Sequence, residues 1–198
     1  MKWRKSTRHP VVIFDPGRLF NSLRSVSAEE LTFVDITVAD VDDIKKLHNQ
    51  LRDYKHETIS IQNTTQQLLD LEALSYESPL PFLGYFAILE SLLTHQPRKT
   101  DTIDSITRQI VKKVILLDNR WNPRIDYSPF PGAKAETIWT TMYGYRSSLA
   151  HGGTPDFKNE FQSLGDHRVA LKLLKWTVKG VLRQALIEPQ LIADLRNC

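Results

Sequence analysis

Arg146 and His151 lie five positions apart in the segment YGYRSSLAHGG, residues 143–153. An arginine is suited to phosphate recognition, because its planar guanidinium donates two parallel hydrogen bonds and stays charged at any working pH. A histidine is suited to proton transfer, because the imidazole ring titrates near neutral pH. Together the two side chains have the chemistry needed to bind a phosphodiester and to move a proton during its cleavage.

The spacing alone is weak evidence, since Arg4 and His9 show it as well. That first copy lies in a basic stretch without apolar periodicity, and we interpret it as chance. Around the second copy, apolar residues recur at helical spacing over 138–149, and Gly152-Gly153 favour a left-handed helix end. We therefore expect the second pair to lie at the C-terminal end of a helix.

Helix geometry limits how this pair can act on one ligand. Five positions along an α-helix correspond to a turn of about 140° and a rise of about 7.5 Å. The two side chains then meet one phosphate only if Arg146 bends across the last helical turn. A site shared between two copies of the chain removes this constraint, because each copy can contact a different atom of the phosphodiester.

The composition is that of an ordinary globular protein, with 198 residues, 41% hydrophobic residues and a net charge of +3. This mild basic charge is compatible with an anionic ligand but does not require nucleic acid. Cys198 is the one cysteine, which excludes an intramolecular disulfide and a cysteine-rich zinc site. No apolar run approaches the roughly 18 residues of a membrane span, and no signal peptide is evident. We therefore expect a cytoplasmic protein without membrane association.

Helical patterns dominate the chain, and they predict the elements that would position the pair. Helices are expected over 41–54, 63–74, 80–94, 101–117, before Gly152, over 166–186 and after Pro189, with Asp40 and Asp166 as N-caps. Segments 11–14 and 31–38 are rich in β-branched and aromatic residues and are compatible with two short strands. The expected fold class is mainly α, an up-and-down antiparallel helical bundle over 61–198 with an N-terminal extension over 1–60.

Glu90 is a carboxylate within the nearly all-apolar helix predicted over 80–94. It is either the one solvent-facing position of that helix or a buried group that needs a cation such as Arg146, and we favour the pairing. Ser147 and Tyr143 are candidate supporting residues. A structural alternative stays open, in which His151 caps its helix and Arg146 is only a structural partner of Glu90.

The apolar segment FLGYFAILESLL (82–93), an amphipathic helix and then the segment 143–153 resemble the Apea-like branch of the HEPN superfamily. The similarity covers roughly residues 79–186, and its two anchors occur in the family's order and approximate spacing. In many members the residue after the arginine is Asn, Asp or His, whereas here it is Ser147. The resemblance implies a helical bundle that pairs through a two-fold axis, with Arg146 and His151 of both subunits facing a shared cleft. It also implies metal-independent RNA cleavage.

The leading hypothesis is a homodimeric, metal-independent endoribonuclease that leaves 2′,3′-cyclic phosphate ends and acts in prokaryotic defence or toxin-antitoxin control, with a cognate antitoxin or regulatory partner. Two alternatives remain: a non-catalytic module that binds RNA or a nucleotide, and a dimerisation or interaction domain. We expect no cofactor and no metal. The histidines lie at no zinc-ligand spacing, and none is near a cysteine; those outside the two Arg-His pairs are His48, His56, His95 and His167.

Overall fold

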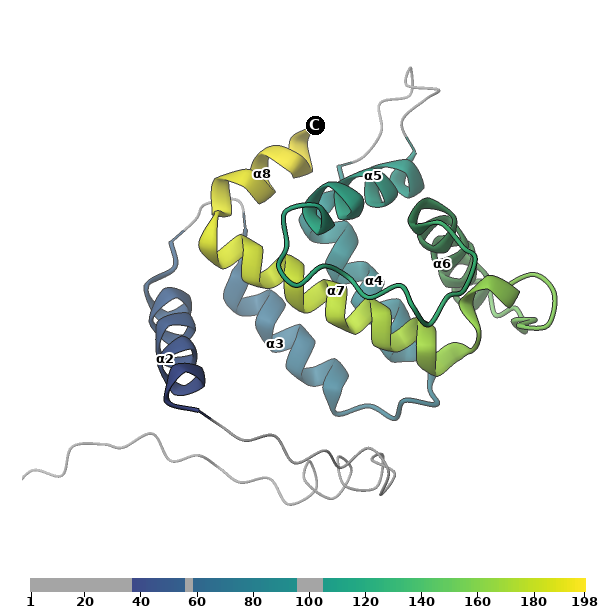
Figure 1. Cartoon of the computed structure of the whole chain (residues 1–198), viewed down its shortest axis with the longest axis horizontal. Helices are drawn as coiled ribbons and strands as arrows, with labels where there is room; N and C mark the ends of the chain where they lie inside the picture. Colours follow the sequence, from purple (N-terminus) through teal and green to yellow (C-terminus); the bar gives the residue numbers. More distant parts are fainter. Residues whose placement is uncertain (1–36, 56–58, 96–104) are drawn as a thin grey trace, which may run out of the picture. The chain divides into compact units, whose positions relative to one another are not determined.

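The computed structural model describes residues 37–55, 59–95 and 105–198, which belong to a compact unit formed by residues 34–198. The expected strands at 11–14 and over 31–36 lie outside the described residues. Those that are described form helices and connecting segments, without a strand, so the prediction of a mainly α fold is confirmed. The helices, labelled in Figure 1, are α2 Val38–Asp53, α3 Ile61–Glu72, α4 Pro79–Leu93, α5 Ile106–Asp118, α6 Ala135–Ala150, the 3-10 helix η2 Gln162–Leu164, α7 His167–Ile187 and α8 Pro189–Asn197.

The start of α2 differs from the sequence prediction. Thr37, not Asp40, is the N-cap: its hydroxyl accepts a hydrogen bond from the Asp40 amide at 3.2 Å, and the Asp40 carboxylate accepts one from the Thr37 amide at 2.8 Å. This reciprocal capping box satisfies two free amides of the first turn. Val38, expected to end a strand, is therefore the first residue of a helix.

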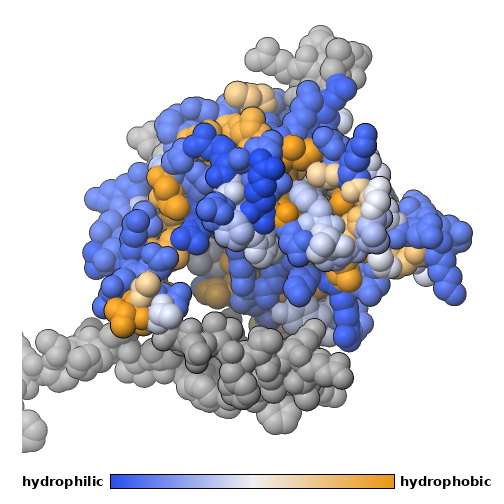
Figure 2. Space-filling model, in the orientation of Figure 1, coloured by the Kyte–Doolittle hydropathy of each residue, from blue (hydrophilic) through white to orange (hydrophobic). Residues whose placement is uncertain are grey.

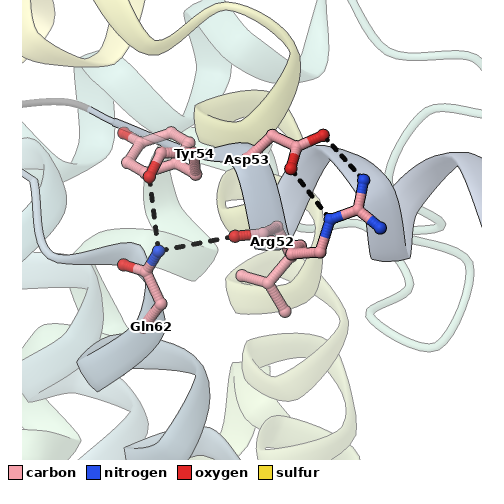
Figure 3. A network of polar contacts seen from close by, with 5 residues as sticks. Arg52, Asp53, Tyr54 and Gln62 are labelled. Carbon is pink, nitrogen blue, oxygen red and sulfur yellow. Dashed lines mark hydrogen bonds and ion pairs between the residues drawn. The ribbon is translucent and has the colours of Figure 1, made fainter. Parts of the chain in front are cut away.

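The connection between α2 and α3 is held by a side chain in addition to the core packing of Leu51, Tyr54 and Ile59. The Gln62 amide on α3 donates to the Leu51 and Tyr54 carbonyls at the end of α2, each at 3.4 Å (Figure 3). Next to it, Arg52 pairs with Asp53 at 2.8 Å. No residue of α2 is buried, so this contact helps to fix where the helix ends.

Helix α4 lies at the centre of the packing. It contacts α3, α5, α6, α7 and α8, which explains why its sequence is apolar on most sides. Its buried side chains are Pro81, Phe82, Tyr85, Phe86, Ile88, Leu89, Leu92 and Leu93. Gly84 is required on the side that faces α3, because a Cβ at this position would overlap the Leu71 side chain. The half-buried Glu90 is thus the one charged group on a helix surrounded by neighbours.

Helix α5 buries most of the apolar stripe that its sequence predicts. On α7 the predicted apolar residues Leu173 and Val181 are buried, but Trp176, expected on the same stripe, is exposed. Ile110, Val114 and Leu117 of α5 are fully buried, whereas Ile103 of the predicted stripe lies outside the described residues. Asp166 caps α7 as expected, since its carboxylate accepts from the Val169 amide at 2.8 Å. None of the helices in the described residues is long and apolar enough to cross a membrane.

Candidate functional site

Helix α6 carries the predicted site residues beside a face that is packed against the core. Ile138, Trp139, Met142 and Tyr145 are buried, and they recur three or four positions apart. Tyr143, Arg146 and Ser147 lie beside this stripe and are half-buried. The packing of α6 therefore fixes the backbone beneath these three side chains.

Arg146 forms an ion pair with Glu90 of α4. The Arg146 Nη2 atom lies 3.3 Å from Glu90 Oε2, and the two side chains are 30% and 21% exposed. The pairing that the sequence favours is therefore present. Because a half-buried carboxylate without a cation is costly, each of these charges stabilises the other.

Tyr143 lies beneath the guanidinium and completes the cluster. The Arg146 Cζ atom is 5.7 Å from the centroid of the Tyr143 ring, and that ring meets Phe86 edge-on at 6.1 Å. Burial raises the pKa of Tyr143, the Glu90 charge raises it further, and Arg146 acts in the opposite direction. The phenol thus keeps its proton at neutral pH, and the neutral ring supports the cation through a cation–π contact.

The Arg146–Glu90 contact is only half of the pair that an arginine and a carboxylate can make. Glu90 Oε1 and Arg146 Nε are both buried, and neither has a hydrogen-bond partner among the described residues. A bidentate pair would use two parallel hydrogen bonds, whereas only the Nη2 bond is present here. Arg146 is therefore held in place while part of its hydrogen-bonding capacity stays unused.

His151 occupies the C-terminal end of α6, where the chain turns. Its backbone amide donates to the Ser147 carbonyl at 3.1 Å, and Gly152 follows with a φ of +72°. Gly152 is the left-handed residue that the sequence predicts. Gly153 serves a different purpose: its amide donates to the Ser148 carbonyl at 2.8 Å, and a Cβ there would lie 2.6 Å from Ser148 Oγ.

The His151 side chain is exposed and makes no hydrogen bond or ion pair with any residue that the structure describes. The structural alternative in which this side chain caps the helix is thus not observed, because the backbone amide of His151 makes the contact instead. The Ser147 side chain has no hydrogen bond within the described ranges either. The structure joins Arg146, Glu90 and Tyr143, and it leaves His151 and Ser147 outside that set.

A second polar pair lies within the core beside this cluster and was missed from sequence. The Tyr145 hydroxyl is 2.6 Å from His167 Nδ1 at the start of α7. Burial raises the pKa of Tyr145 to about 12, so the phenol keeps its proton and can donate it to the ring nitrogen. Because the two residues are 22 positions apart, no local spacing signals the pair. A buried tyrosine needs a hydrogen-bond partner, and this general rule is the one available hint.

Among residues 37–55, 59–95 and 105–198, no group of three or more His, Cys, Asp or Glu side chains is arranged to hold a metal ion. No family model, curated protein or solved structure matches this chain. The assignment to the HEPN superfamily therefore stays a prediction carried by the segments 82–93 and 143–153.

Proposed function

We propose that the protein is a metal-independent endoribonuclease of the HEPN type, in which Arg146 binds the scissile phosphate and His151 transfers protons. The observation that carries this proposal is the geometry at the end of α6. A guanidinium is held by Glu90 and Tyr143 while its side chain stays 30% exposed, and five positions further on an exposed imidazole is free of described partners. The resemblance of the two sequence segments supports the same assignment.

The reaction transfers the phosphoryl group of the RNA from the 5′-oxygen to the 2′-oxygen of the preceding nucleotide. The 2′-oxygen forms a bond to phosphorus while the bond from phosphorus to the 5′-oxygen breaks, which leaves a 2′,3′-cyclic phosphate and a 5′-hydroxyl. One imidazole accepts the proton of the 2′-hydroxyl, and a second, protonated imidazole delivers a proton to the 5′-oxygen. Arg146 stabilises the negative charge on the phosphorane between these steps.

Two histidines are needed in this scheme, and each chain supplies one at position 151. A homodimer that brings the ends of both α6 helices to one cleft provides both, as the resemblance implies. It also removes the constraint of the five-residue spacing, since Arg146 of one copy and His151 of the other can reach the same phosphate. The proposed context, prokaryotic defence or toxin-antitoxin control with a cognate regulatory partner, follows from the resemblance.

The test is cleavage of mixed tRNA, rRNA and a synthetic single strand in EDTA, with the end chemistry of the fragments determined. We expect the parent to cut and to leave cyclic phosphate ends, and the Arg146→Ala/His151→Ala variant to lose activity with its helical content unchanged. The matched control is Arg4→Ala/His9→Ala, which removes the other Arg-x4-His pair of the chain and is expected to cut like the parent. A single 2′-deoxy nucleotide at the mapped cleavage position should block the cut there. Cleavage by the Arg146→Ala/His151→Ala variant would contradict the proposal.

The Arg146–Glu90 ion pair also favours a second function, a non-catalytic module that binds RNA or a nucleotide, because the same guanidinium can hold a phosphate without turnover. In that case the parent binds RNA without cutting it, and Arg146→Ala weakens binding more than His151→Ala does. A purely structural interaction domain would show no ligand effect and a loss of stability when Glu90 or Arg146 is removed.

A further inference from the structure

A pair of tryptophans lies on the surface of α7, apart from the residues used above. Trp176 is 41% exposed, and its ring meets that of Trp121, in the segment 119–134, at a centroid distance of 5.7 Å and an interplanar angle of 70°. At 41% exposure this large side chain still leaves a sizeable part of its apolar ring surface open to solvent. The exposed indole of Trp176 is therefore available for a ligand.

Trp121 is fixed, which makes the pair a rigid support. Its indole Nε1 donates to Gln184 Oε1 at 3.2 Å, and Gln184 in turn donates to Glu188 Oε1 at 3.0 Å. The ring occupies the space over Gly180, where a Cβ would lie 2.8 Å from Trp121 Cη2. Glycine at position 180 is thus needed for this close approach, and Trp176 rests on a ring that cannot easily move.

Helix α7, which carries Trp176, is itself basic. Over its whole length α7 carries five Lys or Arg residues and no Asp or Glu: Arg168, Lys172, Lys175, Lys179 and Arg183. Positions 172, 176 and 183 are spaced by four and seven residues, so they follow one face of the helix. Figure 2, in whose orientation α7 and the segment 119–134 face the viewer, shows mainly hydrophilic side chains with pale and hydrophobic areas between them.

The charges on this face are only partly neutralised within the fold. Lys172 forms no salt bridge with the part of the chain that the structure describes, although its charge adds to the hydrogen bonds from Ser128 in lowering the pKa of Asp126. Arg183 approaches Asp43 only to 3.9 Å with both side chains exposed. Such exposed pairs contribute little and are readily exchanged for another anion. Lys172 and Arg183 therefore offer positive charge on either side of the Trp176 ring.

An exposed indole between two cations matches unpaired RNA better than it matches an acidic peptide. A base stacks on the indole face while the adjacent phosphates meet the cations, and such stacking tolerates any base. A carboxylate can meet the lysine or the arginine but has no planar ring to place on Trp176. In a duplex the bases are already stacked and cannot reach the ring.

We propose that Trp176, supported by Trp121 and flanked by Lys172 and Arg183, binds an unpaired base of single-stranded RNA outside the cleavage site. The inference rests on the proposed function, for which RNA is the substrate, and it specifies that the bound segment is single-stranded. It assigns α7 a role in substrate capture that does not depend on Arg146 or His151.

The test uses a fluorescein-labelled 2′-O-methyl oligouridylate of about 10 nucleotides, within the site sizes known for single-stranded binders, which 2′-hydroxyl attack cannot cleave. Anisotropy at low salt measures affinity, and quenching of intrinsic tryptophan fluorescence reports stacking. We expect Trp176→Ala to weaken binding on the order of tenfold and to remove the quenching, and Trp176→Phe to restore most of the affinity. Lys172→Ala should weaken binding severalfold and lower its salt dependence.

The matched control is Leu116→Ala on α5, an apolar side chain with a similar exposure of 46%. It is expected to bind like the parent. Equal binding by Trp176→Ala and the parent would overturn the inference, as would failure of the parent to bind, or an oligoglutamate competing as well as unlabelled RNA. The Arg146→Ala/His151→Ala variant separates the two proposals: retained binding of the probe supports this site, whereas loss of cleavage tests the nuclease. If the parent binds the probe but cuts no RNA, the nuclease proposal is contradicted while the inferred binding site on α7 is supported.

Discussion

Two clusters in this protein have the same three components, a carboxylate, a cation and a tyrosine ring, and they differ in how completely the charges are paired. At α4 and α6, Glu90 meets Arg146 over the Tyr143 ring. At α3 and α7, Glu72 meets Lys175, whose Nζ atom lies 5.4 Å from the centroid of the Tyr76 ring.

In the Glu72 cluster two cations meet one carboxylate oxygen, which makes these contacts as ion pairs and has no hydrogen bond of good geometry. Glu72 Oε1 lies 2.8 Å from Lys179 Nζ and 3.3 Å from Lys175 Nζ, and Lys175 also donates to the Tyr76 hydroxyl at 3.0 Å. Burial raises the pKa of Glu72, but the two ammonium groups outweigh it and hold that pKa below its usual range. Two cations thus neutralise one carboxylate and join α3 to α7.

In the Glu90 cluster a single bond of 3.3 Å joins the pair, and Arg146 Nε and Glu90 Oε1 have no hydrogen-bond partner among the described residues. The comparison teaches that an ion pair alone does not mark a functional site. A partly exposed guanidinium held by a single ion pair, five positions before an exposed histidine, is what distinguishes the end of α6.

The largest expected effect is on catalysis by Arg146. Replacing Arg146 with Ala is expected to lower the initial rate of RNA cleavage on the order of 10³-fold, because the phosphorane loses its main charge partner. The equivalent change in the other cluster, Lys175→Ala, should leave the rate unchanged. Rates from gel-resolved fragments in EDTA measure both, and equal losses in the two variants would mean that the clusters do not differ in function.

His151→Ala is expected to lower the cleavage rate about 10²-fold, because the variant lacks the imidazole that transfers protons during cleavage. Its midpoint of thermal unfolding should stay unchanged, since the side chain is exposed and makes no described contact. His48→Ala, an exposed histidine on α2, is the control and should match the parent in both rate and unfolding midpoint. A marked stability loss in His151→Ala would instead assign that residue a structural role.

Glu72→Gln is expected to destabilise the fold by about 1.5 kcal/mol at pH 7, because two ammonium groups lose their anion. The pKa of Glu72 is lowered in the folded state, so its contribution is present above the unfolded value of about 4.5 and is lost as the pH falls through the folded value. Urea unfolding of parent and variant at pH 7 and at pH 3 measures the difference. A gap that stays constant with pH would show that the ion pairs do not stabilise the folded state.

The smallest effect is expected at two glycines that form a matched pair. Gly152 and Gly165 both have a φ of +72° with open space at the Cβ position, so an alanine at either should destabilise by about 1 kcal/mol. Only Gly152→Ala should also lower the cleavage rate severalfold, because it disturbs the turn next to His151. Equal rates in the two variants would mean that the geometry of this turn does not matter for cleavage.

Local signals in the sequence predict much of the fold. Asp166 caps α7 as expected, and the buried stripe of α5 follows its apolar periodicity at Ile110, Val114 and Leu117. The predicted start of α2 was wrong because Thr37, not Asp40, is the N-cap, and the two residues form a reciprocal capping box. The β-branched residues before this helix had suggested a strand instead. The predicted domain boundary near residue 60 stays a prediction.

For the site, the sequence predicts the pairing of Glu90 with Arg146, because a carboxylate in an apolar helix needs a cation. It gives no indication of the pairing of Tyr145 with His167 or of Glu72 with Lys175, since each pair joins two different helices, beyond the reach of local spacing. Such contacts depend on how the helices pack, and short-range spacing does not encode them. The roles of Arg146, His151 and Ser147 in cleavage remain predictions.

The most direct test of the central claim is the initial rate of cleavage of one mapped RNA in EDTA by three proteins. They are the parent, the Arg146→Ala/His151→Ala variant and a Glu72→Gln/Lys175→Ala variant that disrupts the Glu72 cluster instead. The account predicts cyclic phosphate ends and similar rates for the parent and the Glu72→Gln/Lys175→Ala variant, with no cleavage by the Arg146→Ala/His151→Ala variant at equal helical content. Unchanged cleavage by the Arg146→Ala/His151→Ala variant, or no cleavage by the parent, would contradict it.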